Sequence, residues 1–274
     1  KCEYDIVSLF SGGMDSLIAT INYLEEGKKP FLVSHSGDGY TTNVQRELLE
    51  KLQKKYDHID IYQFYYHLVF SESVVQGTSR EDSTRSRSFL FIAMAVFVVS
   101  GLEKISVVNV PENGLIAMNV PLDILRLGSL STKTTHPYYL SQWNNVLSGL
   151  ALGINVRNEY QFHTKGEMAL NCKNKELLRE IMSTSVSCSA PSKYRYQGVN
   201  QIHCGHCVPC IIRRAAMFAA FNDDTETNYF KRDIKAAMRF KHTPVGMNFH
   251  SFKLAFSRVT EKAGIERFPS CAGR

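Results

Sequence analysis

The chain has 274 residues, of which 44% are hydrophobic and 21% charged, and its formal net charge is +6. This is the composition of an ordinary globular chain, long enough for one large domain or for one domain with an appendage, and the mild positive charge suits a phosphate-rich ligand or nucleic acid as well as a lysine-rich solvated surface. The longest uncharged apolar run, 89–99, is shorter than the about 20 residues that a bilayer-spanning helix needs, so we expect a buried helix there and no membrane partner.

The first predicted element is a buried strand over 4–10, which a small polar loop connects to a helix over 17–24. Glycine in such a loop lets the backbone approach an anion, and the free N–H groups and dipole of the helix start attract negative charge. Asp15 is a candidate ligand for the Mg²⁺ that accompanies a nucleotide, and it is also a candidate catalytic residue together with Ser11 and Ser16. The candidate phosphate ligands are Ser11, Gly12, Gly13 and Ser16.

The spacing of residues 11–16, the candidate phosphate loop, excludes two common nucleotide motifs. No Gly-Lys-Ser/Thr follows the glycines, as a Walker motif requires, and the order Ser-Gly-Gly-x-Asp-Ser is not the dinucleotide fingerprint. The alternative to a phosphate site is a simple strand-to-helix turn capped by serine.

Strands and helices alternate after the first helix, with short links between them. This alternation predicts an α/β fold with a doubly wound parallel sheet, which we assign to residues 1–170. Ligands bind such sheets at the carboxyl ends of the strands, where Ser34 and His35 are further candidate ligands. The predicted strands cover 29–35, 59–65 and 104–110, and the predicted helices cover 42–56 and part of 83–101, the latter entered through Arg87.

The least regular stretch follows the fourth strand and runs from 111 to 137. Long loops in a compact α/β domain are usually functional, although a solvated surface loop has a similar composition. Beyond it we expect helices over 141–152 and 174–182, with a strand end running into a helix start over 161–168. Arg87 and Lys165 are candidate anion contacts and candidate catalytic residues. The candidates for the rim of a substrate site are Glu112, Asn113, Arg126, Thr132, Lys133 and His136.

Four of the seven cysteines lie close together late in the chain, at Cys188, Cys204, Cys207 and Cys210. A C-x-x-C-x-x-C run with one more cysteine suits a tetrahedral zinc site, and a closed shell of four thiolates makes that zinc structural. An iron–sulfur cluster and free thiols are the alternatives, and His203 or His206 could replace Cys188 as the fourth ligand.

Several further expectations follow from the remaining sequence. Thiol clustering and the lack of a visible signal peptide predict a cytoplasmic protein. Because Lys1 leads almost directly into a core strand, we expect a further segment before it. A helix is predicted over 208–221, with Arg213 and Arg214 pointing either to the active site or to solvent. Residues 171–222 are assigned to a helical zinc-binding region and 223–274 to a C-terminal helical extension.

The phosphate-loop and cysteine motifs together resemble the 7-cyano-7-deazaguanine synthase (QueC-like) family of PP-loop ATP pyrophosphatases, over roughly residues 4 to 222. The loop 34–37, the run 45–47 and the pair 87–88 add to the resemblance. It implies an ATP site at Ser11–Ser16, a zinc at the four cysteines and a 7-carboxy-7-deazaguanine type of substrate. Such enzymes adenylate the carboxylate, ammonia then gives an amide, and a second ATP-dependent step dehydrates it to a nitrile.

The sequence also departs from that family. Ser88 stands where the family has asparagine, and 112–114 with a Ser/Thr-rich loop replaces the family's Tyr-Pro-Asp-Cys-Arg segment. These departures resemble the divergent branch of bacterial anti-phage systems (QatC-like and CBASS-associated), in which a protein amine can replace ammonia. The alternatives are a non-catalytic zinc-containing module that binds nucleic acid or a partner protein, and a PP-loop tRNA-modifying enzyme.

Overall fold

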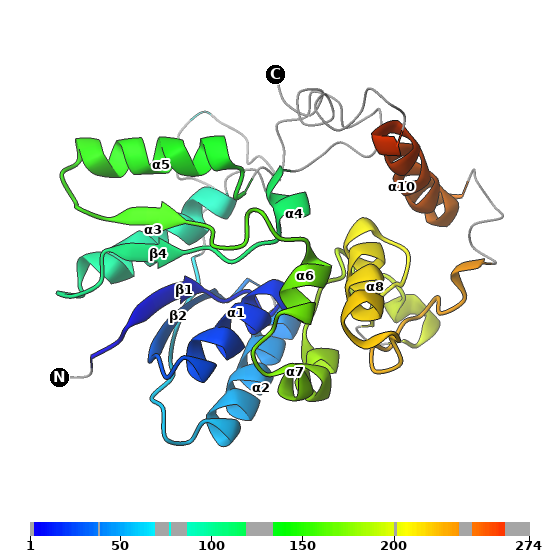
Figure 1. Cartoon of the computed structure of the whole chain (residues 1–274), viewed down its shortest axis with the longest axis horizontal. Helices are drawn as coiled ribbons and strands as arrows, with labels where there is room; N and C mark the ends of the chain where they lie inside the picture. The colour runs from blue at the N-terminus through cyan, green and yellow to red at the C-terminus, as the bar shows by residue number, and fades with distance from the viewer. Residues whose placement is uncertain are drawn as a thin grey trace.

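The computed structural model describes residues 3–37, 39–68, 77, 87–118, 134–199, 202–235 and 243–260. Within them, a five-stranded parallel sheet has the order β3-β2-β1-β4-β5 (Figure 1). β1 lies at the centre, where Val7 is in register with Phe31 on one side and Val108 on the other. The strands are β1 (Ile6–Leu9), β2 (Pro30–His35), β3 (Tyr62–Tyr66), β4 (Val107–Asn109) and β5 (Asn155–Arg157).

Helices cover both faces of this sheet, which confirms the predicted doubly wound α/β fold (Figure 1). On one face lie α1 (Met14–Glu25) and α2 (Gly39–Lys55), and on the other lie α3 (Arg87–Ser100) and α5 (Pro137–Gly149). α1 packs through Leu17, Ile18 and Ile21, whose spacing places them on one side of a helix and which are completely buried. Burying each of these side chains contributes about 2 kcal/mol.

The later helices extend the same core. α6 (Lys165–Leu170) and α7 (Lys175–Ile181) lie beside α1, and α8 (Val208–Phe221) packs on α6 (Figure 1). α4 (Gly114–Met118) follows β4, and α10 (Pro244–Thr260) lies beyond α8 (Figure 1). Met168, Leu177 and Met217 belong to one buried cluster with Leu17 of α1. This cluster therefore spans the boundary that we predicted near residue 170. The short 3₁₀ helices are η2 (Met182–Thr184) and η3 (Arg195–Gln197).

One strand was missed, and two local predictions were wrong. β5 was not predicted, because it has three residues of which only Val156 is buried, too few for a recognisable alternation. The strand end expected at 161–163 is a turn before α6, and α4 occupies part of the stretch expected to be irregular.

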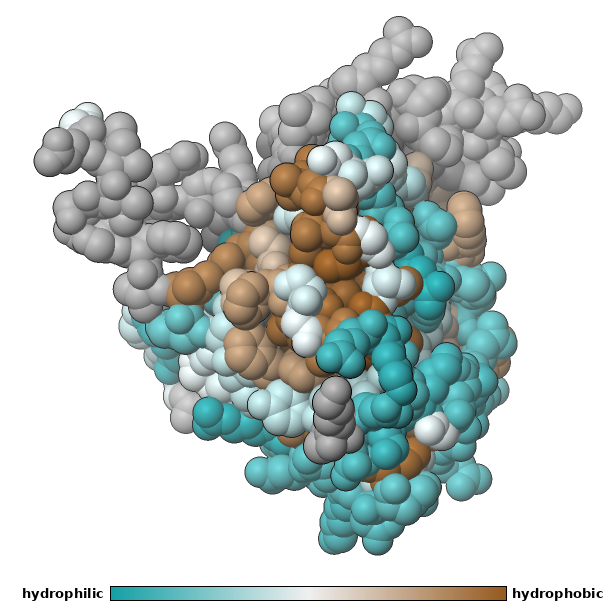
Figure 2. Space-filling view, turned by 90° about the vertical axis from the view of Figure 1, so that its left-hand side faces the viewer, coloured by the Kyte–Doolittle hydropathy of each residue, from teal (hydrophilic) through white to brown (hydrophobic). Residues whose placement is uncertain are grey.

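The helix over 89–99 forms as expected but is not fully buried. Phe89 and Phe97 are 57% and 67% exposed, because only one side of α3 packs on the sheet. Figure 2 shows an apolar area on the side of the molecule that faces left in Figure 1. No helix in the described ranges has the length and apolar character needed to cross a membrane.

Candidate functional site

The candidate site lies where the strand order reverses. The chain builds β1, β2 and β3 outward in one direction and then returns to place β4 on the other side of β1. In open α/β sheets, ligands bind in the crevice outside the carboxyl ends of the two strands at such a switch point. The loop after β1 carries the candidate phosphate ligands, and the loop after β4 carries Glu112 and Asn113.

The phosphate loop makes a tight turn into α1. Gly12 has φ +77°, and a side chain there would also press against Gln45 of α2, whose Cγ lies 3.1 Å from the position of a Cβ. Gly13 is the N-cap of α1 and supplies no side-chain cap, so the first N–H groups of this helix lack the usual side-chain acceptor. Such a helix start suits an anion.

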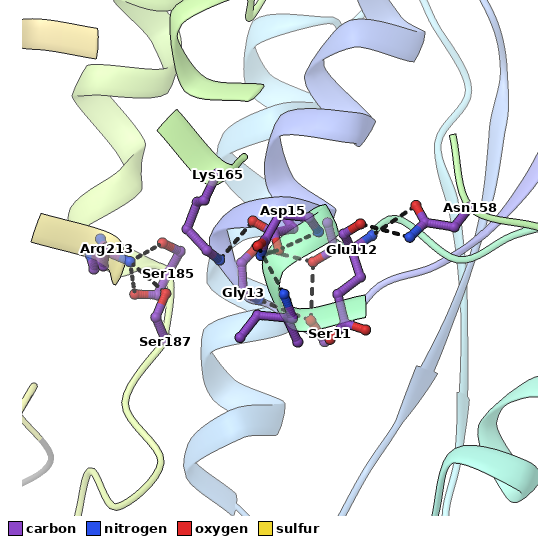
Figure 3. Close-up of polar contacts among 12 residues, drawn as sticks. Ser11, Gly13, Asp15, Glu112, Asn158, Lys165, Ser185, Ser187 and Arg213 are labelled. Carbon is purple, nitrogen blue, oxygen red and sulfur yellow. Dashed lines mark hydrogen bonds and ion pairs between the residues drawn. The ribbon is translucent and has the colours of Figure 1, made fainter. Parts of the chain in front are cut away.

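The two serines of the loop contact each other and the turn. Their hydroxyl oxygens are 3.2 Å apart, the Gly13 N–H donates to Ser11 Oγ at 3.2 Å, and Ser16 Oγ donates to the Gly13 carbonyl at 3.0 Å (Figure 3). Ser11 is exposed, whereas Ser16 is buried. Ser11 is therefore the more accessible hydroxyl of the pair.

Asp15 is the point at which three distant parts of the chain meet. Its Oδ1 lies 2.7 Å from Lys165 Nζ, and its Oδ2 accepts from the Asn113 side-chain amide at 2.7 Å and backbone N–H at 3.2 Å (Figure 3). Lys165 is the first residue of α6, which starts at a capping box formed by Thr164 and Glu167. The structure thus brings together three of the predicted site residues.

Glu112 adds a second carboxylate at this end of the sheet. Its Oε2 accepts from Thr134 Oγ1 at 3.0 Å and from Thr135 Oγ1, and its backbone is held by Asn158, which follows β5. Desolvation raises the pKa of the Glu112 carboxyl above its usual value, and the charge of Asp15 acts in the same direction. A bound cation would relieve this accumulation of negative charge.

The other predicted ligands are placed less directly. Ser34 is buried and donates to the Phe10 carbonyl at 2.7 Å, so it supports the start of the phosphate loop. The His35 ring contacts the rings of Tyr66 and Phe91. Arg87, at the start of α3, reaches the loop after β2: its Nη2 lies 3.3 Å from where a Cβ on Gly37 would be.

The predicted substrate rim is described only in part. His136 is the N-cap of α5 and accepts from the Tyr138 N–H at 3.2 Å, which is a structural role. Arg126, Thr132 and Lys133 lie outside the described residues.

The four predicted cysteines form one cluster that could hold a metal ion. The sulfur atoms of Cys188, Cys204, Cys207 and Cys210 all lie within 4.8 Å of one another, and two of the pairs are 3.9 Å apart. Four thiolates bound at about 2.3 Å around a single tetrahedral ion are about 3.8 Å apart. A four-iron cluster places its own irons and sulfides between the thiolates and holds them further apart. The observed spacing suits a single ion.

The turn between the cysteines depends on a glycine. Gly205 has φ +84°, and a Cβ there would lie 2.4 Å from the Lys231 carbonyl oxygen. The backbone N–H groups of Cys204 and Cys207 donate to Cys188 Sγ and Cys204 Sγ, at 3.4 and 3.3 Å.

Neither histidine near the cluster takes the place of Cys188. His203 Nε2 donates to the Ser185 carbonyl at 3.1 Å, and His206 Nε2 lies 3.0 Å from the Tyr194 hydroxyl. Burial and the nearby Arg213 lower the pKa of His203 to about 4, so its ring is neutral at pH 7.

The two adjacent arginines of α8 correct our prediction, since both are buried and neither points to solvent or into the crevice. Arg214 donates to the carbonyls of Gly205 and Lys231 at 3.1 and 2.6 Å, and its guanidinium lies over the Tyr229 ring. Arg213 donates to Met182, Ser185 and Ser187 in the segment before Cys188.

Sequence reasoning missed Asn158, Thr134, Thr135 and Ser185. The position of Asn158 directly after a strand is a signal that a correct assignment of β5 would have revealed. Thr134 and Thr135 lie in the stretch 111–137 that we expected to be functional, although neither was named as a site residue, and Ser185 gives no local signal.

Comparisons with known proteins add little to what the structure shows about this site. No family model matches the chain, and no curated protein matches its sequence. Among solved structures, the chain is similar to "U34-tRNA thiolase NcsA from Methanococcus maripaludis with its [4Fe-4S] cluster", with 14% sequence identity and a TM-score of 0.39 over 97% of this chain and 76% of that one. So distant a likeness says nothing about what this chain binds or does.

Proposed function

We propose that this protein is an ATP-dependent ligase that adenylates the carboxylate of a 7-carboxy-7-deazaguanine-type substrate and transfers it to an amine. The observation that carries the proposal is the convergence of Lys165 and Asn113 on Asp15, beside a helix start that suits phosphate at the switch point of the sheet. The choice of substrate rests on the family resemblance of the phosphate-loop and cysteine motifs.

The chemistry has two steps. A carboxylate oxygen of the substrate attacks the α-phosphorus of ATP, and pyrophosphate leaves. The amine nitrogen then attacks the activated carbonyl carbon, the C–O bond to AMP breaks, and the amine loses a proton as the amide forms. The amine belongs to ammonia or to a protein acceptor in a bacterial anti-phage system. With ammonia, a second ATP adenylates the amide oxygen, and loss of AMP and a proton then gives the nitrile.

Within this proposal, the phosphate loop and α1 bind the ATP phosphates, while Lys165 and Arg87 balance the charge that develops during transfer. Mg²⁺ bound near Asp15 would supply further neutralisation of the polyphosphate. Asp15 and Glu112 put two carboxylates against one lysine in this crevice, a charge balance that favours a divalent cation.

We assign the cysteine cluster to structural zinc. All four ligands are thiolates, the sulfur spacing suits one tetrahedral ion, and three of the four residues are buried. Such a closed site leaves no position for substrate, so the ion stabilises the region around α8 and takes no part in the reaction.

A thiolation reaction has less support. It requires a reactive cysteine near ATP, and Cys172 is buried in the hydrophobic core beside Leu177, where desolvation raises the pKa of its thiol to about 11. Cys188, Cys204, Cys207 and Cys210 are occupied by the proposed metal, while Cys2 and Cys271 lie outside the described residues.

The test is AMP and pyrophosphate formation by the intact protein with ATP, Mg²⁺, ammonium and 7-carboxy-7-deazaguanine, with product masses determined in parallel. Substrate-dependent AMP that is lost in Asp15→Ala supports the ligase, and the mass distinguishes amide, nitrile and protein adduct. AMP that requires tRNA instead would establish a tRNA-modifying enzyme. Absence of AMP, with salt-dependent nucleic-acid binding that Asp15→Ala leaves intact, would establish the binding module.

A further inference from the structure

The phosphate loop is hydrogen-bonded to the segment that leads to Cys188, the first of the four clustered cysteines. This connecting segment, residues 182–188, runs from η2 to Cys188. Midway along it, the Val186 N–H donates to the Gly12 carbonyl at 3.0 Å, and the Val186 carbonyl oxygen lies 3.4 Å from the position of a Cβ on Gly13. Any displacement of this segment would therefore shift the two glycines of the loop.

The connecting segment is in turn fixed by one buried cation. Arg213 is completely buried, and its Nη1 donates to the Ser185 carbonyl, Ser185 Oγ and Ser187 Oγ at 3.2, 2.9 and 3.2 Å (Figure 3). Its Nη2 donates to the Met182 carbonyl at 2.5 Å. A buried guanidinium requires acceptors for its N–H groups, and these lie in the segment on both sides of Val186.

Arg213 also shares α8 with one of the four clustered cysteines. It lies three residues after Cys210, about one turn further along α8, and its Nε donates to Thr227 Oγ1 at 3.2 Å, outside the connecting segment. His203, next to Cys204, donates to the same Ser185 carbonyl that accepts from Arg213. The segment is thus bonded on one side to the phosphate loop and on the other to residues beside the cysteines.

We propose that Arg213 is a positioning residue that couples the cysteine metal site to the phosphate loop, so that metal and nucleotide strengthen each other's binding. The inference rests on the proposed function, because it takes the nucleotide to bind at residues 11–16. Linkage requires the coupling to be reciprocal: the factor by which metal tightens nucleotide binding is the factor by which nucleotide tightens metal binding.

The experiment measures binding, not turnover. The probe, used with Mg²⁺, is the α,β-methylene analogue of ATP. A carbon replaces the oxygen between its α and β phosphates, so the bond that the proposed reaction breaks cannot be cleaved. Its affinity is measured by calorimetry for the zinc-loaded full chain and for chain stripped by a chelator, and zinc loss to the chelator is followed with and without the analogue. We expect stripping to weaken the analogue about tenfold and the analogue to slow zinc loss.

Two matched variants separate coupling from simple destabilisation. Ser185→Ala and Thr227→Val each remove one buried hydroxyl partner of Arg213, the first inside the connecting segment and the second outside it. With zinc saturating, we expect Ser185→Ala to weaken the analogue severalfold and Thr227→Val to leave its affinity unchanged. Arg213→Lys, where it folds and retains zinc, should weaken the analogue at least as much as Ser185→Ala.

Equal affinities with and without zinc, or equal effects of the two hydroxyl variants, would overturn the coupling while leaving the ATP site intact. Failure of the zinc-loaded wild-type chain to bind the analogue at all would overturn the proposed function, and the coupling with it.

Discussion

Lys165 Nζ lies 2.7 Å from Asp15 Oδ1, and both side chains are about nine-tenths buried, with exposed fractions of 10% and 11%. The two residues are far apart in sequence and meet where α6 starts beside the start of α1. Because buried charges are costly without a partner, this pair fixes the geometry of the crevice as well as its charge.

Lys165→Met should lower the free energy of unfolding by about 3 kcal/mol, because it leaves the Asp15 carboxylate buried without its counter-charge. The matched control is Lys173→Met. Lys173 pairs with Glu26 at the same 2.7 Å but is 49% exposed. Solvent weakens that pair, so its loss should cost at most about 1 kcal/mol. Urea unfolding at pH 7 makes the comparison, and similar small losses in both variants would show that burial does not govern the Asp15 pair.

Glu112→Gln should change how stability depends on pH. Burial raises the pKa of Glu112 in the folded state, so the folded protein binds the proton more tightly than the unfolded chain does. Wild type therefore loses stability relative to Glu112→Gln as the pH rises from about 4.3, the usual glutamate pKa, through the raised value. Glutamine retains an oxygen for the hydroxyls of Thr134 and Thr135.

Urea unfolding of both proteins across this pH range checks the sign. A difference between them that does not change with pH would mean that Glu112 titrates alike in the folded and unfolded states.

Cys188→Ser should remove the metal, whereas Cys172→Ser should not. Cys188 is one of the four clustered thiols, while Cys172 packs in the hydrophobic core. Elemental analysis of the purified proteins should find one zinc per chain in wild type and in Cys172→Ser, and little in Cys188→Ser. Iron and sulfide, with visible absorption, would instead show that the site holds an iron–sulfur cluster.

Gly205→Ala should lower the stability of the protein by more than the cost of placing alanine at a positive φ. Both Gly205 and Gly198 have positive φ, +84° and +73°, but a Cβ on Gly205 meets the Lys231 carbonyl oxygen at 2.4 Å and one on Gly198 meets nothing within 4 Å. Gly198→Ala should cost about 1 kcal/mol for the left-handed backbone, and Gly205→Ala substantially more. Thermal unfolding of the zinc-loaded proteins measures both, and equal losses would exclude the clash.

Local patterns were sufficient to predict four of the five described strands and to find both motifs. The phosphate loop and the cysteines are recognisable because their chemistry requires particular residues at short spacing, and helices such as α1 and α8 show clear apolar periodicity. By contrast, β5 is too short to show a pattern, and its absence from the prediction also concealed Asn158.

Long-range contacts could not be predicted in this way. Lys165 was expected to contact an anion, but its pairing with Asp15 depends on how closely α6 packs on α8. At Gly166 the two helices are so close that an added Cβ would lie 3.1 Å from the Cβ of Ala219. Arg213 resembles a surface residue in sequence, and it is buried because Ser185 and Thr227, both distant in the chain, supply its acceptors.

The central claim is that the crevice at β1 and β4 activates a carboxylate with ATP, and exchange of labelled pyrophosphate into ATP tests it without any acceptor amine. The account predicts exchange by the zinc-loaded protein that requires both Mg²⁺ and 7-carboxy-7-deazaguanine and is lost in Asp15→Ala. Binding of ATP without carboxylate-dependent exchange, or exchange that Asp15→Ala leaves unchanged, would contradict it.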